Sequence, residues 1–271
     1  MTKSKISVES NFLSNPRGNN KSIKNTIKSK APIFSSLTII IIFVGLIAAS
    51  YFTGLFNIKN YKIIGNSQVA KIDIENAISS ETDNKLILTV NPDSIEKGLR
   101  DKFKILYFAR VTKELPSTLV IEVKERTKAA VIRTLENIVL VSQDGVVIQE
   151  LLENQIVNEM YQNIPVVKMI DDPKRNIGYQ YDADYIKSIS TFVNSWNELK
   201  APAYNSILID KEKNVKIALS SNTIITVSLN DPNIDYKNLV SDLTGVYNRL
   251  STNQKIKSID MRFDKIAVTY F

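Results

Sequence analysis

The sequence contains no cysteine and no histidine. Without cysteine, the chain can form no disulfide and supplies no thiol nucleophile or thiolate metal ligand. Without histidine, it lacks the side chain that most often acts as a general base and as a metal ligand. Only carboxylate, serine and lysine chemistry is left, so these two absences argue against an enzyme.

Recognisable catalytic motifs are also missing. The sequence has no G-x-S-x-G, no phosphate-cradling glycine loop and no Ser-x-x-Lys. A hard cation needs more converging oxygens than a pair of acidic residues supplies. The sequence Asp172-Pro173 is more typical of a turn than of a metal site. The sequence therefore predicts no catalytic, metal or cofactor site. The notable carboxylate groupings are Asp171 with Asp172, Asp182 with Asp184, and Glu122 with Glu125.

Positive charge is concentrated at the start of the chain. Residues 1–32 hold seven lysines and arginines against the single acid Glu9, which accounts for +6 of the chain's net charge of +7. The rest is almost neutral, whereas a nucleic-acid-binding domain needs a basic face of its own. The segment is rich in Ser, Asn and Lys without apolar periodicity, so we expect a disordered basic tail at residues 1–32.

A long uncharged run follows the tail. Ile33–Phe56 holds 24 residues without a charge. As a helix rising about 1.5 Å per residue it would reach roughly 36 Å, more than the hydrocarbon core of about 30 Å. The run predicts one transmembrane helix, and its basic flank predicts a cytoplasmic N-terminus with residues 57–271 outside. Ala48-Ala49-Ser50 would suit cleavage of a signal peptide, but the run exceeds the usual h-region of about 7–15 residues and favours an uncleaved anchor.

Residues 57–126 have the pattern of a small α+β module. An alternating run from Ile58 to Ile64 stops at Gly65-Asn66, a turn signal. Asn91-Pro92-Asp93 is a typical helix start, with a capping Asn, a proline at the first position and an early acid. With a helix stripe before it and strands at Ile105–Val111 and Leu119–Val123, the expected order is β-α-α-β-β.

Residues 127–271 are predicted to be strand-rich with two helices. Asp144-Gly145 between apolar runs is typical of a hairpin. Apolar stripes spaced by four and three residues predict helices around Tyr185–Leu199 and Leu239–Leu250. The chain ends on a strand-like run, Ile266–Tyr270. The fold class expected for the whole chain is α+β.

The order of several short motifs resembles known proteins. Gly65-Asn66, Leu115-Pro116 and Glu125-Arg126 stand in the order and spacing of a POTRA domain, placed directly after one predicted span. The ending, Asp260-Met261-Arg262-Phe263 followed by Ala267-Val268, is similar to the Asp-Leu-Arg-Tyr and Ala-Val of the bacterial cell-division family FtsQ/DivIB. The chain therefore resembles that family over about residues 33–271.

The resemblance implies a function and a set of partners. It implies a non-enzymatic, bitopic inner-membrane scaffold of the division machinery, with its bulk in the periplasm and concentrated at the septum. It implies binding to the division proteins FtsB and FtsL, and to FtsK through the POTRA domain. It implies no cofactor, nucleic acid or small-molecule substrate.

The terminal strand is the expected docking site. A last strand can lie at a sheet edge, whose unpaired N–H and C=O groups accept a partner strand. Phe263 would be an aromatic anchor and Arg262 an orienting charge, with the helix from Tyr236 to Leu250 as a second wall. Alternatively, Arg262 and Phe263 only close the fold. The predicted partner-binding residues are Arg262, Phe263, Asp264, Ala267, Val268, Tyr270, Leu239 and Tyr247.

Two other functions compete with this one. POTRA modules also occur in export and outer-membrane assembly factors, which would place the chain in a different membrane. An exported enzyme that acts on the cell wall through carboxylates is the third possibility, and it needs two acids converging in one pocket.

Overall fold

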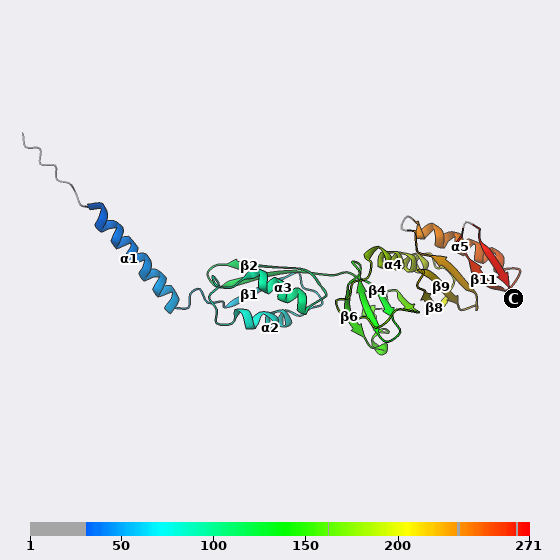
Figure 1. Cartoon of the computed structure of the whole chain (residues 1–271), viewed down its shortest axis with the longest axis horizontal. Helices are drawn as coiled ribbons and strands as arrows, with labels where there is room; N and C mark the ends of the chain where they lie inside the picture. The colour runs from blue at the N-terminus through cyan, green and yellow to red at the C-terminus, as the bar shows by residue number, and fades with distance from the viewer. Residues whose placement is uncertain (1–30, 162, 232–233, 264) are drawn as a thin grey trace, which may run out of the picture. The chain divides into compact units, whose positions relative to one another are not determined.

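The computed structural model describes residues 31–161, 163–231, 234–263 and 265–271, with the side chains of 31–37, 50–52 and 159 left out. The expected basic tail thus lies outside the described residues, as does Asp264. The chain divides into two compact units, residues 1–52 and 53–271 (Figure 1).

The described part of the first unit is a single helix. Helix α1 runs from Ala31 to Phe52, so it begins two residues before the predicted span and ends four residues before its end. Its described side chains, Thr38–Ala49, are all exposed. Among the described residues, no helix has both the length and the apolar character needed to cross a membrane.

The second unit begins with the predicted β-α-α-β-β order. Asn91 caps α3 by accepting a hydrogen bond from the Asp93 N–H at 3.1 Å, as its sequence predicted. Strand β3 lies in the middle of a three-stranded sheet, parallel to β1 and antiparallel to β2. The core is made by Ile74 and Ile78 on α2 and by Ile95 and Leu99 on α3. The elements are β1 (Asn60–Ile64), α2 (Lys71–Thr82), α3 (Pro92–Lys102), β2 (Leu106–Glu114) and β3 (Thr118–Glu125).

The rest of the second unit is built on one nine-stranded sheet, in the order β12-β11-β10-β9-β8-β7-β4-β5-β6. The two predicted helices are α4 (Ala183–Glu198) and α5 (Tyr236–Ser251), and short 3₁₀ turns lie at Glu153–Gln155 and Glu159–Tyr161. The strands are β4 (Lys128–Arg133), β5 (Ile138–Ser142), β6 (Val147–Leu151), β7 (Val166–Met169), β8 (Tyr204–Ile209), β9 (Asn214–Leu219), β10 (Ile224–Ser228), β11 (Ile256–Asp260) and β12 (Ala267–Tyr270).

Each helix connects two neighbouring parallel strands. Helix α4 joins β7 to β8 and α5 joins β10 to β11, because a parallel pair needs a crossover connection. Both helices lie on the same side of the sheet (Figure 1), where they bury Phe192 and Trp196 of α4 and Val240 and Leu243 of α5. This arrangement leaves β6 and β12 as the two edges of the sheet.

The structure adds three details that the sequence pattern did not provide. Strand β7 was not predicted, because its four residues are too short a run to stand out. On α5 the predicted Leu243 is buried and Leu239 and Leu250 pack against the core, but Tyr236 and Val240 are buried as well, and the helix also contacts α4. The N-cap of α4 is Asp182 and not its neighbour Asp184, since the Asp182 side chain accepts from the backbone of Asp184 and Tyr185.

Candidate docking edge

Strand β12 is the open edge of the nine-stranded sheet. It pairs antiparallel with β11 only, and no other strand of the described chain lies on its far side. The Phe271 N–H donates to the Lys255 carbonyl at 3.2 Å, so the main chain of Phe271 faces β11. Because main-chain groups alternate in direction along a strand, those of Val268 and Tyr270 face outward. The edge thus offers two residues' main-chain groups for pairing.

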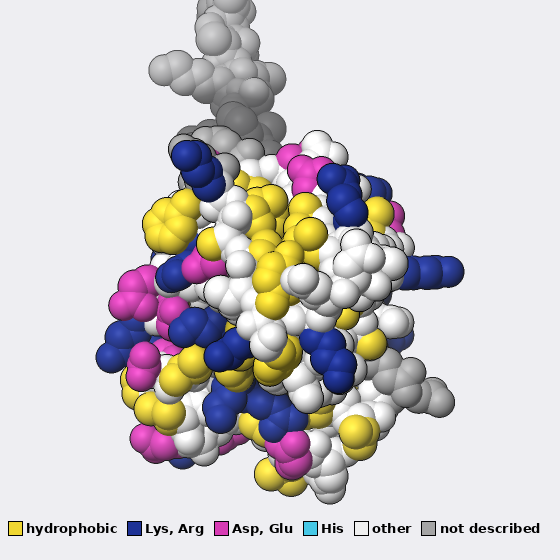
Figure 2. All heavy atoms as spheres, turned by 90° about the vertical axis from the view of Figure 1, so that its right-hand side faces the viewer, with side chains coloured by type: hydrophobic (Ala, Val, Ile, Leu, Met, Phe, Trp, Pro, Cys, Tyr) yellow, Lys and Arg dark blue, Asp and Glu magenta, His cyan; other side chains and the backbone are white. Residues whose placement is uncertain are grey.

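Exposed apolar side chains surround this edge. Phe263 is 70% exposed and Phe271 is 73% exposed, and Ile266 and Tyr270 are exposed to a smaller extent, 43% and 42%. Figure 2 looks onto the end of the molecule where the chain terminates, and apolar and basic side chains lie beside one another there. Aromatic side chains with an accessible basic neighbour are typical of binding hot spots.

Arg262 is held in place by Asp260. The Arg262 Nε donates to Asp260 Oδ1 at 3.0 Å, and Nη2 contacts Asp260 Oδ2 at 2.6 Å. The hydrogen bond from Arg262 lowers the pKa of the Asp260 carboxyl, against a smaller opposing effect of burial. The guanidinium also lies 5.4 Å from the centre of the Phe263 ring. The first and third residues of the Asp260-Met261-Arg262 motif therefore form a fork that positions a cation beside an exposed aromatic ring.

Helix α5 contributes a groove at the end of the edge strand. Tyr247 and Phe271 both line a groove of about 550 Å³ beside the end of β12. The Tyr247 hydroxyl donates to Ser221 Oγ at 3.0 Å, which fixes the ring. Tyr247, Leu239 and Val268 are all half-buried and pack against the core.

The predicted residues thus fall into two groups. The structure exposes Arg262, Phe263, Ala267 and Tyr270 around the edge, whereas Tyr247, Leu239 and Val268 are half-buried. It also adds Phe271, which the sequence analysis missed although an aromatic residue at the chain's end was the available signal.

The beginning of the opposite edge of the same sheet is covered. The Val147 N–H of β6 donates to the Tyr179 carbonyl at 2.9 Å, and the Gly178 N–H returns a bond to the Val147 carbonyl at 2.8 Å. The Tyr181 N–H donates to the Gly145 carbonyl at 2.8 Å. Residues 178–181, here called the β6 cover, thus occupy the place of a further strand.

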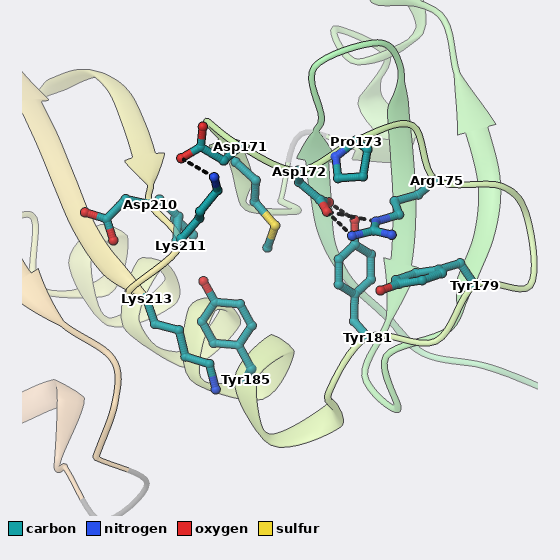
Figure 3. Close-up of a pocket in the computed structure, with 12 residues that line it drawn as sticks. Asp171, Asp172, Pro173, Arg175, Tyr179, Tyr181, Tyr185, Asp210, Lys211 and Lys213 are labelled. Carbon is teal, nitrogen blue, oxygen red and sulfur yellow. Dashed lines mark hydrogen bonds and ion pairs between the residues drawn. The ribbon is translucent and has the colours of Figure 1, made fainter.

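A charged pocket of about 310 Å³ lies beside the β6 cover (Figure 3). The Asp172 carboxylate accepts from Arg175 Nε at 2.8 Å and from the Tyr181 hydroxyl, and the Arg175 guanidinium lies 4.0 Å from the Tyr179 ring centre. Burial, and then the bond to Asp172, raise the pKa of Tyr181. Because these groups bind one another, we interpret them as the cluster that holds the β6 cover in place. No three described Asp or Glu residues are arranged to hold a metal ion.

The motifs of residues 57–126 have structural causes. Gly65 has φ +87°, and a Cβ there would lie 2.1 Å from the Val123 carbonyl oxygen, so no other residue fits. The Glu125 carboxylate accepts backbone hydrogen bonds from Ser67 and Gln68 at 2.8 Å and from Val69 at 3.0 Å. These contacts explain why the motifs Gly65-Asn66 and Glu125-Arg126 occur together.

Comparison with known families agrees with this module. The family model described as POTRA domain, FtsQ-type, matches residues 56–126. No curated protein matches the chain. FtsQ-type POTRA domains are non-enzymatic protein-interaction domains. Residues 56–126 are thus a POTRA domain of FtsQ type, and this match supports the resemblance of the chain to the FtsQ/DivIB family.

Proposed function

We propose that this chain is a non-enzymatic, bitopic scaffold of the bacterial division machinery. The FtsQ-type POTRA domain indicates a division-related scaffold. The resemblance of the last strands to FtsQ/DivIB extends the proposal to residues 127–271 as an FtsQ-type β domain. The domain limits proposed are 1–32 for the tail, 33–56 for the span, 57–126 for the POTRA domain and 127–271 for the β domain.

We further propose that Ile33–Phe56 anchors the chain in the inner membrane. The uncharged run and its basic flank support one span with the N-terminus in the cytoplasm and the bulk in the periplasm. Helix α1 covers most of this run, and all of its described side chains are exposed. Concentration at the septum follows from the proposed role.

The open edge of β12 is the observation that carries the proposed binding function. An extended segment of FtsB, with FtsL beside it, would add to the sheet at the outward-facing groups of Val268 and Tyr270. Phe263 would be the apolar anchor, and Arg262, already oriented by Asp260, would meet an acceptor on the partner. Tyr247 of α5 would line the end of the same surface. We assign FtsK to the POTRA domain on the resemblance alone.

The high exposure of Phe263 favours docking over a role in closing the fold. A side chain that closes a fold loses most of its exposed surface, whereas Phe263 keeps 70% of it. Removing the Phe263 ring should therefore lower the stability of the free protein little, but it should remove the whole apolar contact with a partner.

The experiment is capture of FtsB by the full chain carrying Phe263→Ala or a deletion of residues 265–271. We expect the deletion to abolish capture, and Phe263→Ala to weaken it by about 2 kcal/mol, the scale of a hot spot. Leu152→Ala is the matched control, because Leu152 is 66% exposed and lies at the end of β6. Undiminished capture by both folded variants would remove the assignment, and a fluorescent fusion spread evenly over the membrane would contradict the septal role.

A further inference from the structure

The edge strand of the POTRA sheet is closed by two side chains of its own domain. Strand β2 lies at one end of the sheet order β1-β3-β2, so one side of it faces away from β3. Glu96 Oε1 accepts from the Val111 N–H at 2.8 Å, and Arg100 Nη1 donates to the Ala109 carbonyl at 3.3 Å. Both side chains come from α3, one helical turn apart. We call these two contacts the β2 latch.

The β2 latch occupies the groups that strand pairing would use. A strand adding to an edge donates to a carbonyl and accepts from an N–H two residues along, which is the pattern that Arg100 and Glu96 reproduce. The two side chains approach each other to only 4.0 Å, so they contact the strand more closely than each other. Their side chains keep 41% and 21% of their exposure, while Ile95 and Leu99 of the same helix are buried. The latch can therefore open without disturbing the core.

From this geometry we propose that the latched β2 edge is a latent self-association surface, whose occupant is β2 of a second copy of this chain. Antiparallel pairing about a two-fold axis at Thr112 places Val111 opposite Lys113 of the second copy and Ala109 opposite Leu115, and so uses both latched groups. On the open face it places Arg110 directly opposite Glu114 of the second copy, an opposite-charge pair that is formed twice. An axis at Arg110 instead sets like charges opposite each other. The complementarity of β2 to itself thus selects the first register.

The latch holds this surface closed in the free protein. As long as Glu96 and Arg100 remain in place, an incoming strand must break two existing hydrogen bonds before it forms its own. Removal of both side chains leaves a nine-residue strand with an uncovered edge, a known template for pairing.

The test uses the absence of cysteine in the natural chain. Thr112→Cys adds a single thiol on the exposed face of β2, and in the proposed register two such residues lie directly opposite each other, with Cβ atoms about 4.5–5.5 Å apart, within reach of a short bismaleimide. In the full chain, Glu96→Ala with Arg100→Ala should raise the yield of cross-linked dimer at least fivefold over Thr112→Cys alone.

The matched control is Lys97→Ala with Asp101→Ala, which also removes one cation and one anion four residues apart on α3. It should leave the yield unchanged. Equal yields with and without the latch, in chains whose circular dichroism is native, would overturn the proposal, as would an equal rise in the control. If the double variant does not fold, Arg100→Ala alone frees the Ala109 carbonyl and must still raise the yield, or the proposal fails.

Discussion

The two edges of the nine-stranded sheet have opposite properties. At β6, the chain returns as the β6 cover and exchanges main-chain hydrogen bonds with Gly145 and Val147. At β12, the outward main-chain groups of Val268 and Tyr270 have no such cover within the described chain, and aromatic side chains crowd around them. An uncovered strand edge invites pairing with other chains. One sheet therefore protects one edge and leaves the other available.

The POTRA sheet extends this comparison. Its β2 edge is closed by side chains, whereas the β6 edge is closed by main chain. In both cases a segment of the same protein takes the hydrogen-bonding positions of a partner strand. The edges at β2 and β6 thus carry groups of the same protein, whereas β12 has no such cover within the described chain, and this contrast supports β12 as the functional edge.

Breaking the β6 cover should have the largest effect. Gly145 has φ +85°, and a Cβ there would lie 2.3 Å from the Tyr181 carbonyl oxygen. Gly145→Ala must therefore push the cover away from β6, in addition to the cost of a left-handed residue. We expect the free energy of unfolding, measured in denaturant, to fall by about 2–4 kcal/mol.

Gly245→Ala is the control for this substitution. Gly245 lies inside α5, with nothing within 4 Å of the position of a Cβ, so alanine should be neutral or stabilise by about 0.5–1 kcal/mol. If both variants lose the same stability, the cover does not depend on the close approach at Gly145.

A proline at the open edge should have a smaller effect on folding and a clear effect on binding. Tyr270→Pro removes an outward N–H that takes no part in the β11–β12 ladder, whereas Tyr270→Ala removes the ring and keeps the N–H. The affinity for FtsB should therefore fall about tenfold further for proline than for alanine, about 1.4 kcal/mol. Titration calorimetry measures the difference, and equal affinities would mean that the partner uses side chains alone.

Many of the helices and turns around these two sheets could be predicted from the sequence, because the signals for them lie in neighbouring residues. The caps at Asn91 and Asp182 and the turn at Gly145 depend on neighbours in the chain, and all three are present in the structure. The POTRA order was confirmed for the same reason. Strand β7 was missed, because a run of four residues is too short to stand out in the sequence, and the burial of Tyr236 and Val240 on α5 was missed as well.

The edges themselves could be predicted only in part. A last strand is a reasonable candidate for a sheet edge, and β12 is one. Neither the β6 cover nor the β2 latch has a sequence signature, since each joins residues that are 9 to 36 positions apart with no characteristic spacing. Whether the remaining predicted residues bind a partner stays a prediction, and Asp264 lies outside the described residues.

The smallest expected effect concerns Glu125, whose carboxylate accepts hydrogen bonds from main-chain donors in the POTRA domain, as the carboxylate of Glu96 does on β2. Burial alone would raise the pKa of Glu125, but the backbone hydrogen bonds from Ser67, Val69 and Gln68 outweigh it and hold the pKa below its ordinary value of 4.5. A carboxyl whose pKa is depressed by folding adds stability that is complete above 4.5 and is lost as the pH falls through the folded value.

We therefore expect Glu125→Gln to cost about 1 kcal/mol of unfolding free energy at pH 7, since the carboxylate accepts from several donors but remains partly exposed to solvent. Below pH 4.5 the two stability curves should converge, because the natural chain then loses the same charge. Glu122→Gln is the control, because Glu122 is exposed and lies on the same strand, β3, three residues before Glu125. A gap between the natural chain and Glu125→Gln that does not narrow at all as the pH falls below 4.5 would mean that the side chain acts by its shape, and the closure of main-chain donors by charge would then be limited to β2.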